Sequence, residues 1–140
     1  MAHPAIIGVS RITDKNNQLS APELFAKCIE SAILDFVKDE DSVRRLKESI
    51  TDVVTVRMVL DDIFLAKKGP QFKNLAHQVA KMTGLKNVKR FFGTTSGGNT
   101  PQMIVNMFSE KILKGEAECV VIVGGECLQT FQKVLSENIL

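Results

Sequence analysis

The chain alternates between two kinds of hydrophobic pattern. Four stretches are compactly apolar or β-branched, which predicts strands at residues 4–12, 52–60, 87–95 and 118–126. The stretches between them carry apolar residues three and four positions apart, which predicts helices at residues 20–37, 72–83 and 101–114 and a further helix from Leu128. Apolar runs without strict alternation are typical of strands covered on both sides. This order predicts an α/β fold with a mostly parallel sheet and helices on both faces.

The helix predicted over residues 20–37 has the clearest signals. Ser20 followed by Glu23 matches a capping box, in which each residue satisfies a backbone amide of the other. Cys28 falls on the apolar stripe of this helix, so we interpret it as a packing residue. A second, shorter helix is expected through Val43 and Leu46. His77, beside the stripe of a later helix, is interpreted as a surface or packing residue.

The composition of the chain argues against several classes of partner and binding site. The 140 residues are 44% hydrophobic, and 18 basic against 16 acidic residues leave a net charge of only +2. That balance gives no electrostatic reason to expect nucleic acid or a membrane surface as a partner. Three cysteines in apolar surroundings, with no leader-like start, fit a reducing compartment, so we expect a cytoplasmic or organelle-lumen protein. CxxC and HExxH motifs are missing, and we expect no metal site.

Two glycine-containing loops stand where ligands bind in parallel sheets, after the carboxyl ends of strands. The first, residues 94–100, leads into a helix whose N-terminus can stabilise an anion, and the second is residues 124–126. The plainer alternative is that the first loop only makes a sharp strand-to-helix turn. P-loop, GxGxxG and GxSxG patterns are missing, which argues against nucleotide sites of those types and against an autonomous hydrolase.

Residues 96–126 resemble the nucleophile region of thiolases, the acyl-CoA acetyltransferases. In that family a Cys-x-Ser-Gly turn opens a buried helix that ends at a glycine, and the next strand ends in Gly-Gly near a glutamate. Here the matching features are Gly115, the strand Cys119–Val123 and the run Gly124-Gly125-Glu126. Residues 4–12 and 20–36 are also similar to the start of thiolase chains, so the resemblance covers nearly the whole sequence.

The resemblance implies a layered thiolase-like fold and a site for acyl-CoA or a related thioester. The thioester would be a substrate or ligand, and no separate cofactor is expected. The substrate-binding residues that it implies are Ser96, Gly97, Gly98, Asn99, Thr100, Gly124 and Gly125.

The family's nucleophilic cysteine is missing from this sequence. Counting back from the helix end at Gly115 places Gly98 at the cysteine position, and a one-residue offset would place Gly97 or Asn99 there. None of these can form a thioester, so the usual cysteine-based acyl transfer is not available at this position. Cys127 is a candidate for a reactive thiol near the site, whereas Cys119 is expected to be buried and inert.

Thiolases contain two similar α/β halves, and residues 1–140 correspond to only part of such a chain. The fifth strand of the family's first sheet would come after Leu140, so the first half is expected to be incomplete. The resemblance therefore implies a partial N-terminal domain of an acetyl-CoA acetyltransferase homologue, a fragment that is inactive alone. Thr100 and Asn99 are expected to share the capping of the helix after the loop.

Two other functions remain open. The chain could be a non-catalytic interaction module that forms a homo-oligomer through the strand Val88–Thr94, where Phe91 and Phe92 would make the edge apolar on both faces. The alternative for those two phenylalanines is ordinary core packing. The chain could also be a binder of small anions or nucleotides that uses only the helix terminus at residues 94–100.

Overall fold

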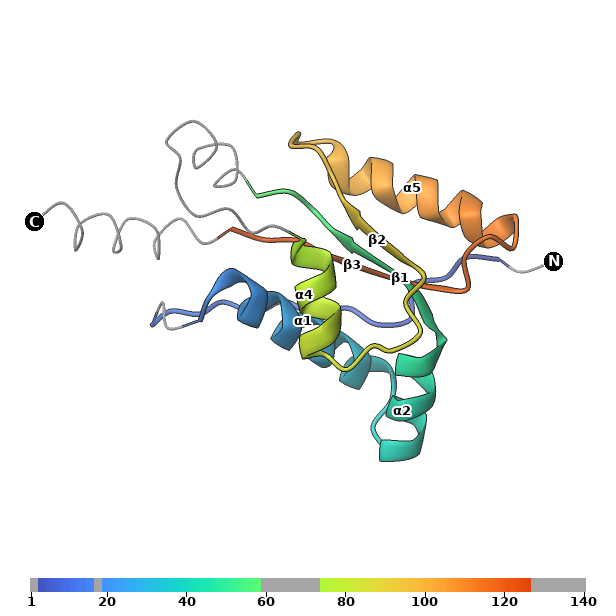
Figure 1. Cartoon of the computed structure of the whole chain (residues 1–140), viewed down its shortest axis with the longest axis horizontal. Coiled ribbons are helices and arrows are strands. Elements are labelled where there is room, and N and C mark those ends of the chain that lie inside the picture. Colours follow the sequence, from blue (N-terminus) through green and yellow to red (C-terminus); the bar gives the residue numbers. More distant parts are fainter. Residues whose placement is uncertain (1–2, 17–18, 59–73, 127–140) are drawn as a thin grey trace, which may run out of the picture.

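The computed structural model describes residues 3–16, 19–58 and 74–126, and the account below is confined to them (Figure 1). Along the chain the elements are α1 (Ala21–Phe36), α2 (Glu40–Ser49), β1 (Ile50–Thr55), α4 (Leu75–Met82), β2 (Arg90–Gly93), α5 (Thr100–Leu113) and β3 (Cys119–Val123). Cys127 and the helix expected from Leu128 lie outside the described residues.

The described strands form one three-stranded sheet in the order β2-β1-β3. Both neighbours of β1 run parallel to it, as the sequence predicted. Thr55 pairs in register with Gly93 on one side and with Val123 on the other. Because the pairs are in register, the carboxyl ends of the three strands lie at the same edge of the sheet.

Helices cover both faces of this sheet, which confirms the predicted layers (Figure 1). Side chains alternate along β1, so Val53 packs into the cluster that contains α1 and α4, and Val54 packs against α5 on the opposite face. Both valines are 0% exposed. The central strand is therefore buried on both sides, which explains why its sequence is apolar without alternating.

Local sequence signals set the helix ends. Ser20 and Glu23 form the predicted capping box at the start of α1. The short helix expected near Val43 and Leu46 is α2. Gly115 follows α5 with a φ of +71°, a left-handed conformation that glycine adopts without a steric penalty.

The predicted first strand, residues 4–12, is wrong. These residues form neither helix nor strand, and Ile6 and Val9 are 80% and 64% exposed. They attach to α1 instead: the Val9 amide donates to the Asp35 carboxylate, and the Ser10 hydroxyl donates to the Cys28 carbonyl. A β-branched run becomes a strand only where a neighbouring strand pairs with its backbone, and none of the described strands does so here.

Candidate functional site

The loop of residues 94–100 is tied to the carboxyl edge of the sheet by Thr94. The Thr94 amide donates to the Thr55 carbonyl (3.1 Å), and its hydroxyl oxygen accepts a hydrogen bond from the Arg57 amide (2.9 Å). Thr94 is buried, whereas residues 95–99 are exposed. The loop is therefore fixed to the sheet at Thr94, and its exposed residues 95–99 are accessible to a ligand. Ligand sites in parallel sheets lie at this carboxyl edge.

The loop leads directly into the N-terminus of α5. Thr100 is buried at the first helical position, and its amide donates to the Gly97 carbonyl (3.1 Å). The predicted capping by Thr100 and Asn99 is wrong. Thr100 is the first residue of the helix and not its N-cap, and Asn99, which is at the N-cap, has a helical backbone (φ −88°, ψ −8°) and makes no capping hydrogen bond with its side chain. A capping side chain usually needs an extended N-cap backbone. The first turn also holds no acidic residue, so nothing in that turn neutralises the positive end of the helix dipole.

The two adjacent glycines of the loop have different roles. Gly97 has a φ of +156°, and a Cβ added to it would lie 3.0 Å from Oγ1 of Thr100 and 3.2 Å from Oδ1 of Asn99. The turn therefore requires a glycine at 97. A Cβ at Gly98 would meet nothing within 4 Å, and its φ is not in the left-handed range. Gly98 thus marks an exposed position beside a helix N-terminus where a side chain has room.

The second loop leaves the carboxyl end of β3 at Gly124 and Gly125. A Cβ on Gly124 would lie 2.8 Å from Cβ of Val56, so glycine allows the ends of β1 and β3 to approach closely. The Val56 amide donates to the Val123 carbonyl (2.8 Å) and holds the two ends together. Gly125 faces the ring of Phe25 on α1, at 3.3 Å from an added Cβ.

Both candidate loops lie at one edge of the sheet, on opposite sides of β1. Gly93 and Val123 pair with the same residue, Thr55, so they are two strand spacings apart, or about 10 Å. Ser96, Gly97, Gly98, Asn99 and Thr100 form one end of this edge, and Gly124 and Gly125 form the other. Backbone amides and a helix N-terminus are available there, which suits binding of an anionic or strongly polar group.

The two described cysteines differ from a reactive thiol in their surroundings. Burial raises the pKa of the Cys119 thiol above its ordinary value of 9.0, in line with the expectation that it is inert. Cys28 packs against the core cluster, and its Sγ lies 2.9 Å from the Ser10 hydroxyl. His77 is exposed on α4 and its ring lies 4.9 Å from that of Phe91, so it is a surface packing residue as predicted.

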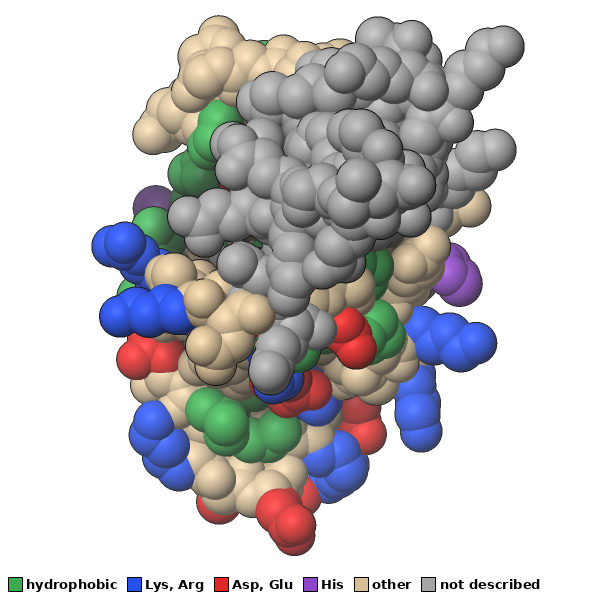
Figure 2. Space-filling model, turned by 90° about the vertical axis from the view of Figure 1, so that its left-hand side faces the viewer, with side chains coloured by type: hydrophobic (Ala, Val, Ile, Leu, Met, Phe, Trp, Pro, Cys, Tyr) green, Lys and Arg blue, Asp and Glu red, His purple; other side chains and the backbone are tan. Residues whose placement is uncertain are grey.

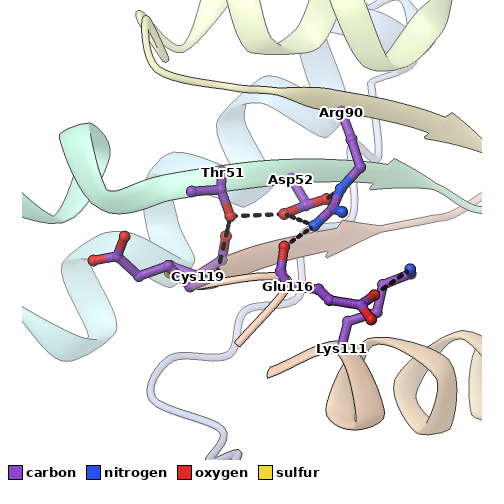
Figure 3. Close-up of polar contacts among 7 residues, drawn as sticks. Thr51, Asp52, Arg90, Lys111, Glu116 and Cys119 are labelled. Carbon is purple, nitrogen blue, oxygen red and sulfur yellow. Dashed lines mark hydrogen bonds and ion pairs between the residues drawn. The ribbon is translucent and has the colours of Figure 1, made fainter. Parts of the chain in front are cut away.

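A buried polar cluster at the opposite, amino edge of the sheet was missed by the sequence reasoning (Figure 3). Asp52 of β1 is 0% exposed, forms an ion pair with Arg90 of β2, and accepts a hydrogen bond from the Thr51 hydroxyl (2.6 Å). The Arg90 guanidinium also donates to the Glu116 carbonyl just before β3. The cluster joins all three strands far from the two loops, so we interpret it as structural. An acidic residue inside an apolar strand was the signal that could have revealed it.

Two further observations concern the charged surface and the length of the helices. On the face shown in Figure 2, basic and acidic side chains of the described residues lie interspersed and are not separated by sign. None of the described helices is long and apolar enough to cross a membrane.

Comparison with known proteins supports the same architecture. No protein-family model matches the chain, and no curated protein matches it. Among solved structures it is similar to a monomeric SCP2-thiolase-like protein type 1 from Mycobacterium smegmatis, with a TM-score of 0.67 and 27% sequence identity. The match covers 85% of this chain and 22% of that protein, so the chain spans about a fifth of its length. The chain therefore has a thiolase-like α/β fold.

Proposed function

We propose that this chain is part of a thiolase-like acetyl-CoA acetyltransferase homologue and binds acyl-CoA or a related thioester at residues 94–100. The observation that carries this proposal is the position of Gly98. It is exposed beside an α5 N-terminus that lacks a side-chain cap, and its Cβ direction is open. A thioester carbonyl placed there would lie near backbone amides and the positive helix end, which favour negative charge on oxygen.

The same geometry argues for binding without covalent transfer at this position. A glycine offers no atom that can accept an acyl group, and the exposed hydroxyls of the loop belong to Thr95 and Ser96. We therefore assign ligand binding to this chain, and we assign no covalent step of the classical thiolase reaction to residues 97–99.

Calorimetry with acetyl-CoA, free CoA and inorganic phosphate tests the binding. We expect acetyl-CoA to bind and to lose affinity when loop residues Ser96 and Asn99 are changed to bulkier side chains. No heat at millimolar acetyl-CoA would overturn the acyl-CoA assignment. Phosphate that competes as well as CoA would instead favour a general anion binder at the helix terminus.

A restored nucleophile provides a sharper test. In the Gly98→Cys variant the thiol at the helix N-terminus would lose its proton to solvent, and the thiolate would attack the thioester carbonyl. A new carbon–sulfur bond would form, the carbon–sulfur bond to CoA would break, and the CoA thiolate would take up a proton from solvent. We expect mass spectrometry to find the acyl group on the peptide that contains residue 98. Asn99→Cys is the matched control for a one-residue offset. If both variants fold and neither is acylated by a bound thioester, residues 98 and 99 are not at the reacting carbon.

A second candidate function is a homo-oligomeric interaction module that uses the edge strand β2. Phe91 and Phe92 are 44% and 41% exposed, and β2 has a described partner strand on one side only. The similar solved protein is described as monomeric, so this function needs its own measurement. Light scattering of Phe92→Lys, with Met103→Lys on exposed α5 as the control, separates the cases. A monomeric wild-type chain, or a dimer unchanged by Phe92→Lys, would contradict this function.

A further inference from the structure

Thr100 is almost completely buried, yet its hydroxyl has no hydrogen-bond partner in the part of the chain that the structure describes. The residue is 2% exposed. Its amide donates to the Gly97 carbonyl, but its hydroxyl takes part in no hydrogen bond to a described residue. Buried polar side chains nearly always have a partner, so a hydroxyl without one calls for an explanation such as a ligand that is bound in the working protein.

The hydroxyl faces the exposed turn that precedes α5. A Cβ added to Gly97 would lie 3.0 Å from Oγ1 of Thr100 and 3.2 Å from Oδ1 of Asn99, so both oxygens lie on the same side of Gly97. Residues 95–99 are exposed, and a Cβ added to Gly98 would meet nothing within 4 Å. Because neither glycine carries a side chain, a small group of a ligand can approach the turn closely.

The surroundings of the hydroxyl favour a ligand group that accepts a hydrogen bond. A threonine hydroxyl has one hydrogen to donate. It lies at the N-terminus of α5, a helix of 14 residues whose first turn holds no acidic residue. The positive end of the helix dipole disfavours a cation there and favours an oxygen with full or partial negative charge. The matching group is therefore a carbonyl oxygen or an oxyanion.

We propose that the Thr100 hydroxyl donates a hydrogen bond to the carbonyl oxygen of the thioester. Thr100 is then the residue that distinguishes a thioester from a CoA compound without this carbonyl. This role rests on the proposed binding of acyl-CoA at residues 94–100 and names the atom that is recognised. A site that bonds a polar group of its ligand rejects an analogue without that group, because the buried partner in the site is then left unpaired.

The test compares two ligands that differ at this atom, on the 140-residue chain. Acetyl-CoA has the carbonyl, whereas S-ethyl-CoA has a methylene group in its place and cannot accept the hydrogen bond. We expect calorimetry to show that the wild-type chain binds acetyl-CoA about five- to ten-fold more tightly, the value of one hydrogen bond. Thr100→Val lacks the donor and should bind the two ligands equally. Thr100→Ser keeps the hydroxyl and should keep the preference.

Urea unfolding separates this role from a purely structural one. Valine and threonine are both β-branched and have similar helix propensities, so Thr100→Val changes little except the hydroxyl. Because that hydroxyl bonds to no described residue, the valine variant should be as stable as wild type or more stable. A hydroxyl that only held the end of the helix would make the valine variant less stable and would leave the preference between the two ligands unchanged.

Three outcomes would overturn the proposal. The first is equal affinity of the wild-type chain for acetyl-CoA and S-ethyl-CoA, a result that does not depend on the folding of any variant. The second is a Thr100→Val variant that still prefers acetyl-CoA. The third is an equal loss of affinity for both ligands in that variant, which would place a phosphate of CoA at the hydroxyl. If neither ligand binds to the wild-type chain, the acyl-CoA assignment fails as well.

Discussion

Gly97 and Gly98 are adjacent in the sequence, yet the structure predicts opposite responses to the same substitution. Gly97→Ala places a Cβ in contact with the side chains of Thr100 and Asn99, on a backbone with φ of +156°. Gly98→Ala places a Cβ where no other atom lies within 4 Å. The two substitutions are chemically identical and both positions are exposed, so a difference between them reports backbone conformation together with the contacts of the added Cβ.

The expected magnitudes follow from these two environments. Holding a residue with a Cβ in a sparsely populated backbone region costs about 1–3 kcal/mol, and the 3.0 Å contact with Thr100 adds to the strain. We expect Gly97→Ala to lower the free energy of unfolding by about 2 kcal/mol. Gly98→Ala should leave it unchanged or raise it by up to about 0.7 kcal/mol, because alanine reduces the conformational entropy of the unfolded chain.

Urea unfolding followed by far-ultraviolet circular dichroism measures both changes. The chain has no tryptophan and no tyrosine, so intrinsic fluorescence is a poor probe. With a urea dependence of roughly 1.5 kcal/mol per M, a 2 kcal/mol loss moves the midpoint down by about 1.3 M. The Gly98→Ala midpoint should stay in place or rise by less than about 0.5 M.

The reasoning would be refuted if the two variants lost stability equally, or if Gly97→Ala were neutral. Either result would mean that the turn is not held in the conformation described here. It would also remove the basis for placing a cysteine at Gly98, because that experiment depends on free space at this position.

Substitutions at three other positions test the packing and the electrostatics. Asp52→Ala should lower stability in urea unfolding by about 2 kcal/mol through lost hydrogen bonds to a buried carboxylate, and Asp52→Asn should lower it less, because one oxygen acceptor remains. An equal loss in both would contradict that explanation. Ile104→Ala, at a residue 0% exposed between Val54 and Phe108, should cost about 3 kcal/mol in the same assay, and a loss below about 1 kcal/mol would show that the α5 face is loosely packed. Burial raises the pKa of Cys119 in the folded state, so the stability that this thiol contributes is complete below pH 9 and is lost as the pH rises through the folded pKa. In the Cys119→Ala variant, the free energy of unfolding measured in urea should fall less steeply between neutral and alkaline pH. An unchanged dependence of this free energy on pH would exclude Cys119 as the cause of the fall.

Much of the architecture could be predicted because it depends on local and periodic patterns. The capping box of Ser20 and Glu23 involves residues three positions apart, so it can be read directly from the chain. The apolar spacing of α5 and the stop at Gly115 are equally local. The strand predicted at residues 52–60 overlaps β1, because β-branched side chains buried on both faces leave a dense apolar run, but β1 ends at Thr55 and the predicted strand extended too far.

The errors concern features that depend on distant parts of the chain. Residues 4–12 have the composition of a strand, but a strand also needs a neighbour to pair with its backbone, and that neighbour is not encoded in the segment. Asn99 has a favourable N-cap side chain, yet its helical backbone prevents the bond.

The sequence alone established the α/β class, most element positions and the two glycine loops, since each of these rests on periodicity or on residue chemistry within a few positions. It could not show that Gly97 and Gly98 differ in conformation. It also could not show that Asp52 pairs with Arg90, which lies 38 positions later in the sequence. Those distinctions depend on which atoms the folded chain brings within contact distance. Contacts between strands and loops are set by the packing of the whole sheet, and no single segment carries that information.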